Sequence, residues 1–246
     1  MPVEECGNMI ITETNIAIAT GDTSFAQEHF SVLEKWAEYL LKFGQDPGDQ
    51  LCTDDFAGHL AHNCNLSLKA IMGVRGMAML CEMSGKTEKS AYYKREAEKM
   101  ADIWLETALN SDGSTRLAFD QPDTFSMKYN MVWDRVWKTE LFSQELTDTE
   151  LKSNKTYFNK YGMPLDSRAD YTKSDWLVWT ASMASSKETF EAFISPLWKT
   201  YNESSTRVAL TDWYDTVSGK MVSFKHRTVQ GGLFMKILMD SWRKDK

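Results

Sequence analysis

The sequence predicts an all-α protein built from helical hairpins. Apolar residues recur at helical spacing through most of the chain, and short turns with glycine or serine separate apolar segments from amphipathic ones. A helical hairpin cannot bury its apolar face alone, so hairpins must stack on their neighbours. Stacking in a ring gives an α/α toroid, and stacking in a line gives a solenoid. Because the units are uneven and their connectors long, we expect a toroid, as a single domain over residues 1–246.

Four helices are expected in the first part of the chain. The second of them has an apolar face at helical spacing, and Thr23 or Ser24 is suited to cap it. The predicted helices cover residues 8–19, 24–43, 62–83 and 87–109.

An internal repeat supports the hairpin interpretation. Residues 20–23 are matched by residues 84–87, and residues 34–38 by residues 98–102, both at an offset of 64 residues. A weaker third copy covers residues 174–201, with a Ser-Ser break between its two helices. Each copy is an apolar helix, a tight turn and an amphipathic helix.

Long connectors and a glycine pair mark the remaining chain. Long ordered connectors often carry function, so we expect them to gather around one mouth of the ring. They are residues 45–61, 110–129 and 202–228. The last helix is expected over residues 228–242. Gly231 and Gly232 are poor helix formers near its start, so they should permit close packing or a close ligand.

The composition of the chain excludes or disfavours several classes of function. The net charge of −7 disfavours a nucleic-acid partner, and no apolar run is long enough to span a membrane. The first residues carry no signal peptide. The four cysteines form no Cys-x-x-Cys pair and are expected to be buried thiols. Nucleotide-binding loops are absent and the His and Asp spacings match no strong metal motif, so neither cofactor nor metal is predicted.

The polar stretch over residues 49–69 is the first candidate site. Asp54 and Asp55 precede a predicted helix, so they either cap it or supply a carboxylate that activates water. His59 or Glu5 could supply the acid that protonates a leaving group. These four residues are the catalytic candidates.

Three residues at the start of the following helix are candidates for substrate binding. Asn65 and Lys69 are four residues apart and share a helix face, and Asn63 precedes them. Lys69 stands among apolar residues, so it should be paired. Two alternatives remain open: a buried ion pair with Asp54 or Asp55, or a cation for a substrate carboxylate.

Two clusters of aromatic and acidic residues form the second candidate site. Aromatic faces beside acids hold sugars and small polar ligands, although core packing explains many tryptophans equally well. The candidate residues are Asp175, Trp176, Asp212, Trp213 and Tyr214. Arg227 could bind a carboxylate with two parallel hydrogen bonds, or form a structural ion pair with Asp212 or Asp215. We expect Glu5, the twin aspartates Asp54 and Asp55, and Arg227 to meet at one hollow.

Several segments resemble the glutaminase A-like family of fungi and Bacteroides-type bacteria. They are residues 2–9, 49–58, 62–70 and 212–215, with Arg227 and Gly231-Gly232. The resemblance implies an α/α toroid of the six-hairpin glycosidase type, incomplete here because the opening helices are absent. It also implies that the chain is the C-terminal part of a longer secreted or periplasmic protein with a β-rich N-terminal region. The implied reaction is hydrolysis of glutamine to glutamate and ammonia.

Three functions are therefore open. The first is a glutaminase, in which Asp54 or Asp55 activates water, Glu5 or His59 protonates ammonia, and Lys69 or Arg227 holds the substrate carboxylate. The second is a glycoside hydrolase, which an open groove lined by Trp176 and Trp213 would favour. The third is a non-catalytic carbohydrate-binding or interaction domain.

Overall fold

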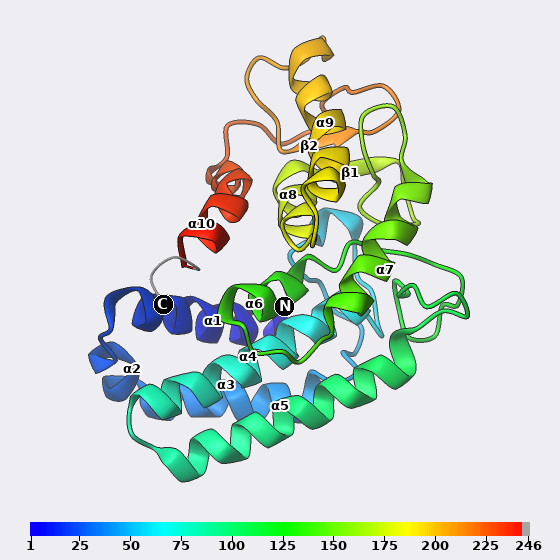
Figure 1. The fold of residues 1–246 in the computed structure, drawn as a ribbon. Coiled ribbons are helices and arrows are strands. Elements are labelled where there is room, and N and C mark those ends of the chain that lie inside the picture. Colours follow the sequence, from blue (N-terminus) through cyan, green and yellow to red (C-terminus); the bar gives the residue numbers. More distant parts are fainter. Residues whose placement is uncertain (243–246) are drawn as a thin grey trace. The chain divides into compact units, whose positions relative to one another are not determined.

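The computed structural model describes residues 1–242, and the chain divides into two compact units (Figure 1). The first unit contains residues 1–108 and 118–122, and the second contains the rest. Apart from one two-stranded sheet, the regular elements of the described residues are helices, so the all-α class is confirmed. No helix within residues 1–242 is both long and apolar enough to cross a membrane.

The first unit is organised around a buried helix, α4. Its elements are α1 (Pro2–Thr20), α2 (Ser24–Glu28), α3 (Phe30–Phe43), the 3₁₀ helix η1 (Asp55–Ala57), α4 (Cys64–Met83) and α5 (Thr87–Ala108). Most residues of α4 are buried, and α4 packs against α1, α3 and α5 (Figure 1). A helix that is apolar on nearly every side requires such cover, whereas α3 and α5 bury one face only.

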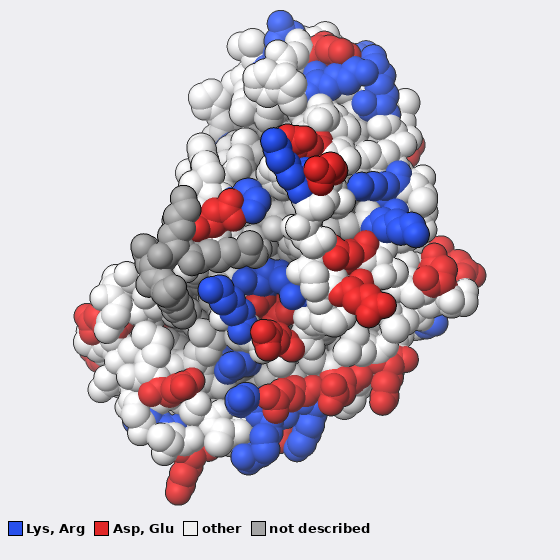
Figure 2. Space-filling model, viewed as in Figure 1, with Lys and Arg blue, Asp and Glu red and all other residues white. Residues whose placement is uncertain are grey.

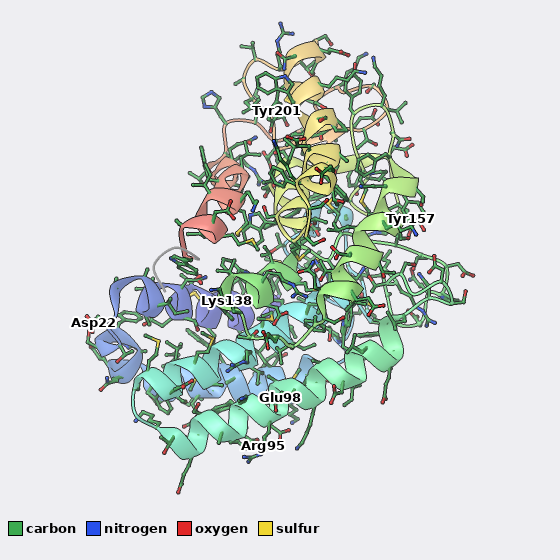
Figure 3. The ribbon with its side chains drawn as sticks, in the orientation of Figure 1. Asp22, Arg95, Glu98, Lys138, Tyr157 and Tyr201 are labelled. Carbon is green, nitrogen blue, oxygen red and sulfur yellow. The ribbon has the colours of Figure 1, made fainter. Side chains whose placement is uncertain are left out.

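Acidic and basic side chains are interspersed on the exposed face of α5 (Figures 2 and 3). Lys94 and Glu98 lie 4.0 Å apart, and Lys99 donates to Glu96 at 2.6 Å. Exposed pairs of this kind add little stability. They keep the outer side of α5 in water, and the apolar side of α5 faces α4.

The first predicted helix starts too late in the sequence. A turn was expected before Asn8, but α1 begins at Pro2, whose missing N–H and restricted φ suit a first helical position. Gly7 therefore lies within the helix. A Cβ there would be 2.6 Å from Lys69 Cγ, so α4 approaches α1 at this glycine. The close contact between α1 and α4 explains the glycine at this position, which local helix propensity alone would assign to a turn.

The predicted repeat is confirmed in the turns of the first unit. Gly21 ends α1 with φ +71°, and Gly85 precedes α5 with φ +73°, so both matched turns use a left-handed glycine. The second predicted helix is wrong in one respect, because a break at His29 separates α2 from α3. Neither proline nor glycine marks that break in the sequence.

The second unit combines short helices with a small sheet. Its elements are η2 (Tyr129–Met131), α6 (Val132–Trp137), α7 (Gln144–Asn154), η3 (Lys155–Tyr157), β1 (Tyr171–Lys173), α8 (Ser174–Ser182), α9 (Lys187–Glu203), β2 (Trp213–Asp215), η4 (Thr228–Phe234) and α10 (Met235–Trp242). Strands β1 and β2 pair antiparallel, with Lys173 opposite Trp213. The predicted third hairpin is confirmed as α8 and α9, and Ser186 caps α9 by accepting from the Thr189 N–H at 3.1 Å.

Two parts of the second unit differ from the prediction. Helices α6 and α7 lie just past a predicted connector, and their ends are set by Lys138 at φ +56° and by the Ser143 cap. The last predicted helix is divided, because the segment with Gly231 and Gly232 forms the 3₁₀ helix η4 before α10 begins. Glycine lowers the stability of a regular α-helix, which fits this tighter start.

The four cysteines are buried thiols without disulfides, as predicted. Burial raises the pKa of Cys81 to about 11, so its thiol stays protonated at neutral pH. These residues act as small apolar side chains in the core.

Candidate active site

A buried ion pair joins α1 and α4 in the first unit. Lys69 Nζ lies 3.3 Å from Glu4 Oε1 and donates to Asn8 Oδ1 at 2.6 Å. Glu4 Oε1 also accepts from Asn8 Nδ2 at 3.0 Å and from the Thr53 hydroxyl. We call Glu4, Asn8, Thr53 and Lys69 the Glu4 cluster.

The charges of the Glu4 cluster stabilise one another. Glu4 is 1% exposed and Lys69 is 4% exposed. Burial raises the pKa of Glu4, but the Lys69 ammonium and the hydrogen bonds from Thr53 and Asn8 outweigh it, so the pKa lies below its ordinary value. The expected buried ion pair of Lys69 is thus present, and its acidic partner is Glu4 rather than Asp54 or Asp55.

The four catalytic candidates lie in the first unit, but they differ in exposure. Asp54 is buried, whereas Glu5, Asp55 and His59 are exposed. His59 Nδ1 lies 3.6 Å from Asp49 Oδ2, and both side chains are in solvent. Glu5 is one helical step of about 100° from the buried Glu4, and this step turns its side chain to the exposed side of α1. Their catalytic roles remain predictions, and burial favours Asp54 over the other three.

The asparagines at the start of α4 are buried. Asn63 caps the helix, since its Oδ1 accepts from the N–H groups of Asn65 at 2.9 Å and Leu66 at 3.1 Å. The N-cap residue of α4 is therefore Asn63 rather than Asp54 or Asp55. Asn65 is itself buried one turn before Lys69. Their binding roles remain predictions.

In the second unit a network of charges surrounds Asp212. Lys173 Nζ and Arg227 Nη2 both donate to Asp212 Oδ2, the latter at 2.7 Å. Lys173 Nζ also lies 3.8 Å from Asp175 Oδ1. Three of these side chains are at most 2% exposed, whereas the Arg227 side chain is 38% exposed. We call Lys173, Asp175, Asp212, Arg227 and the neighbouring Gln230 the Asp175 cluster.

The two carboxylates of the Asp175 cluster differ in their pKa values. Burial raises the pKa of Asp212, but hydrogen bonds from Arg227 and Lys173 outweigh it, so the pKa is lowered. Burial raises the pKa of Asp175 to about 6, with Lys173 opposing and Asp212 adding to the rise. Asp212 is therefore fixed as an anion, while Asp175 changes its charge near neutral pH.

The buried polar atoms that lack a hydrogen-bond partner among the described residues include Asp175 Oδ1, Trp179 Nε1 and Gln230 Nε2. Asp175 and Trp179 are one turn apart on α8. Gln230 Oε1 accepts from the hydroxyls of Ser174 at 3.4 Å and Tyr201 at 3.3 Å, and Tyr201 lies on α9 (Figure 3). Buried polar atoms are nearly always paired, so one acceptor and two donors here suit a small polar ligand.

Gly232 brings η4 close to α8. A Cβ at Gly232 would be 2.7 Å from Asp175 Cβ and 3.0 Å from Trp179 Nε1, whereas a Cβ at Gly231 would have nothing within 4 Å. The expectation that the glycine pair permits close packing is confirmed for Gly232.

We expect Gly232→Ala to lower the free energy of unfolding by about 1–3 kcal/mol, because the methyl group must displace Asp175 or Trp179. Gly231→Ala is the matched control and should change it by less than about 1 kcal/mol. Urea denaturation of both variants measures the difference. Equal effects would show that the close approach at Gly232 is unimportant.

The three aromatic residues that were predicted to bind substrate pack against other residues of the protein. The Trp176 ring stacks on Tyr129 with centroids 4.2 Å apart, and Trp213 packs against Phe224 with centroids 5.0 Å apart. Tyr214 is buried and donates to the Tyr161 carbonyl at 3.1 Å. This packing favours the core interpretation of the three residues, and their binding roles remain predictions.

Arg227, Asp175 and Asp212 are brought together as charged groups of one cluster, and the structural ion pair of Arg227 with Asp212 is present. The expected hollow shared by Glu5, the twin aspartates and Arg227 joins residues of different units, and it remains a prediction.

Sequence reasoning did not select Glu4, Lys173, Trp179 or Gln230. A charged residue inside an apolar stretch signals a buried pair, as Lys69 showed, but Lys173 lies among polar residues of the sequence, so this signal was not available for it. Glu4 and Glu5 could be distinguished only once α1 was known to begin at Pro2, because one helical step turns a side chain by about 100°.

Comparison with known proteins assigns most of the chain to one protein family. Residues 1–237 match the family described as the glutaminase A six helical-hairpin domain. A protein named Glutaminase A from Aspergillus oryzae is 34% identical over 245 residues, covering 97% of this chain and 35% of that protein. A protein named Probable glutaminase from Arthroderma benhamiae is 32% identical over 247 residues, covering 88% of this chain and 28% of that protein. The chain thus spans about a third of the length of these curated relatives.

Proposed function

Because this chain belongs to the family of the glutaminase A six helical-hairpin domain, we propose that it contributes to a hydrolase that converts L-glutamine to glutamate and ammonia. The observation that carries the proposal is Asp175, a buried carboxylate whose pKa is raised to about 6 and whose Oδ1 has no hydrogen-bond partner among the described residues. A carboxylate with a pKa near the working pH is suited to accept and return a proton.

Hydrolysis of the amide requires two proton transfers by Asp175. As a carboxylate it takes a proton from the water that attacks the amide carbon. As the carbon–nitrogen bond breaks, it returns that proton to the nitrogen, so glutamate and ammonia leave. Burial supports both steps, because it brings the pKa of the carboxyl group closer to neutrality.

The groups near Asp175 are suited to bind the side-chain amide and the α-carboxylate of glutamine. A primary amide both donates and accepts hydrogen bonds, which complements Asp175 Oδ1 as acceptor and Gln230 Nε2 and Trp179 Nε1 as donors. Arg227 is the exposed cation of the cluster, and one side of its guanidinium is held by Asp212. Its remaining N–H groups can bind the α-carboxylate of the substrate.

The direct test is ammonia release from glutamine by the full-length protein, with asparagine and a nitrophenyl glycoside as competing substrates. The proposal expects glutamine to be hydrolysed well above the other two. Hydrolysis of the glycoside in preference to glutamine would replace the proposal with the glycosidase hypothesis.

The twin aspartates provide a rival for the role of base. We expect Asp55→Asn to retain ammonia release, because Asp55 is exposed, and Asp54→Asn to lose less activity than Asp175→Asn. Initial rates for the three variants rank the carboxylates. A larger loss in Asp54→Asn than in Asp175→Asn would transfer the role of base to Asp54.

A carbohydrate function gains no support from the two tryptophans that suggested it. Trp176 packs on Tyr129, and Trp213 packs between Tyr171 and Phe224. The β-rich N-terminal partner and the export of the whole protein are further parts of this proposal, and they rest on the resemblance alone.

A further inference from the structure

A pocket lies in the first unit, and none of its lining residues belongs to the Glu4 cluster. It has a volume of about 340 Å³ and is lined by residues of α1, α2 and α3 and by His29 between α2 and α3. Figure 1 shows these three helices. Its walls are mainly apolar and include Met9, Ile16, Phe25, Val32, Leu33 and Trp36. The volume lies within the range of about 300–1,000 Å³ that is typical of small-molecule sites.

One carboxyl group interrupts the apolar lining. Glu13 projects from α1 into the pocket lining and is 5% exposed. Its Oε1 has no hydrogen-bond partner among the residues that the structure describes. An unpaired carboxylate oxygen in an apolar surrounding is costly, so this position calls for a hydrogen-bond donor, and a charged donor most of all.

The groups around Glu13 do not supply a hydrogen-bond donor to its Oε1 atom. Burial raises the pKa of Glu13, the Ala26 N–H and His29 lower it, and Asp22 raises it again. His29 lies at the side of the pocket, where its ring contacts Phe25 with centroids 4.4 Å apart. None of these groups donates a hydrogen bond to Glu13 Oε1.

We propose that this pocket binds a small molecule with a compact apolar body and a protonated amino group. The body is held by the apolar walls, and the ammonium donates to Glu13 Oε1. The aromatic rings of Phe25 and Trp36 add a favourable environment for a cation. This site is independent of glutamine hydrolysis, because it shares no residue with the Asp175 cluster.

Calorimetric titration of the purified chain at pH 7.5 tests the proposal with two probes of nearly equal shape. Benzylamine carries the ammonium group, and benzyl alcohol is its neutral counterpart. We expect benzylamine to bind at least about tenfold more tightly, because the alcohol is a neutral donor and cannot form a hydrogen bond between two charged groups. Equal affinities, or no binding of benzylamine, would overturn the proposal.

Three variants locate the binding. Glu13→Gln should weaken benzylamine by about tenfold or more and leave benzyl alcohol unchanged. Glu98→Gln is the matched control, since Glu98 is an exposed carboxylate on α5 outside the pocket lining (Figure 3), and it should bind both probes like the parent chain. Val32→Trp places a large ring at an exposed wall position and should abolish binding of both probes.

Every outcome of these titrations either supports or contradicts the proposed amine site. Unchanged benzylamine affinity in Glu13→Gln or in Val32→Trp would show that the amine binds elsewhere. If Glu13→Gln does not fold, the comparison of the two probes on the parent chain and the Val32→Trp result still decide, because neither requires that variant.

Discussion

Asp175→Asn should lower ammonia release from glutamine by about 10²–10⁴-fold, the usual contribution of a positioned general base. Asparagine keeps the size of the side chain but cannot accept a proton, so the loss should appear in kcat rather than in KM. The parent rate should also fall as the pH drops through about 6, where Asp175 becomes protonated. Initial rates between pH 4.5 and pH 8.5 measure both effects.

The same substitution should not destabilise the fold at neutral pH. Burial raises the folded-state pKa of Asp175 above its ordinary value of 3.8, to about 6, so the ionised form opposes folding. That cost is complete above about pH 6 and is absent below about pH 4. Asp175→Asn should therefore raise the free energy of unfolding at pH 7.5 by up to about 2–3 kcal/mol. Lys173 retains Asp212 as its partner.

A matched control separates catalysis from general damage. Asp240→Asn removes a half-exposed carboxylate that pairs with Lys236 on α10, and it should leave both the rate and the stability close to those of the parent protein. An Asp175→Asn enzyme with a normal rate would refute the proposed base. A slow enzyme that is also strongly destabilised would assign Asp175 a structural role.

The second large effect concerns the buried pair of Glu4 and Lys69. Lys69→Met should lower the free energy of unfolding by about 3–5 kcal/mol, because Glu4 keeps its charge and loses its cation in a buried place. This is a large share of the about 5–15 kcal/mol that stabilises a typical domain. Urea denaturation at pH 7 measures the loss.

The double variant with Glu4→Gln and Lys69→Met is the control for that loss. Replacing both charges should recover much of the stability, since no unpaired ion remains. The pH dependence adds a second readout. The folded-state pKa of Glu4 lies below its ordinary value of 4.5, so its contribution is present above pH 4.5 and disappears as the pH falls through the folded-state pKa. The double variant should lack this contribution, and a double variant as unstable as Lys69→Met would argue against the ion pair.

Much of the helical architecture can be read from local chemistry. The 3.6-residue spacing of apolar residues located α3, α4, α5, α8 and α9, and the repeated glycine turns located the C-terminal end of α1 and the start of α5. Lys69 could be recognised as a buried, paired charge from its apolar neighbours alone. These features depend on residues close in sequence, which is why the pattern was sufficient.

Other features depend on residues far apart in the chain. Gly7 was predicted to lie in a turn, but it lies in α1 where α4 approaches closely. Glu5 was selected as a candidate and Glu4 was not, because the start of α1, which decides which of the two is buried, was not known. The difference between the pKa values of Asp212 and Asp175 also depends on residues that are far apart in the chain.

By itself, then, the sequence determined the all-α class, most of the helix boundaries, the four buried thiols and the family to which the chain belongs. Only the tertiary structure decided which carboxylates carry unusual pKa values and which cations hold them. The physical reason is that a pKa depends on burial and on neighbouring charges, and strands β1 and β2, helix α8 and helix η4 supply both from separate parts of the chain.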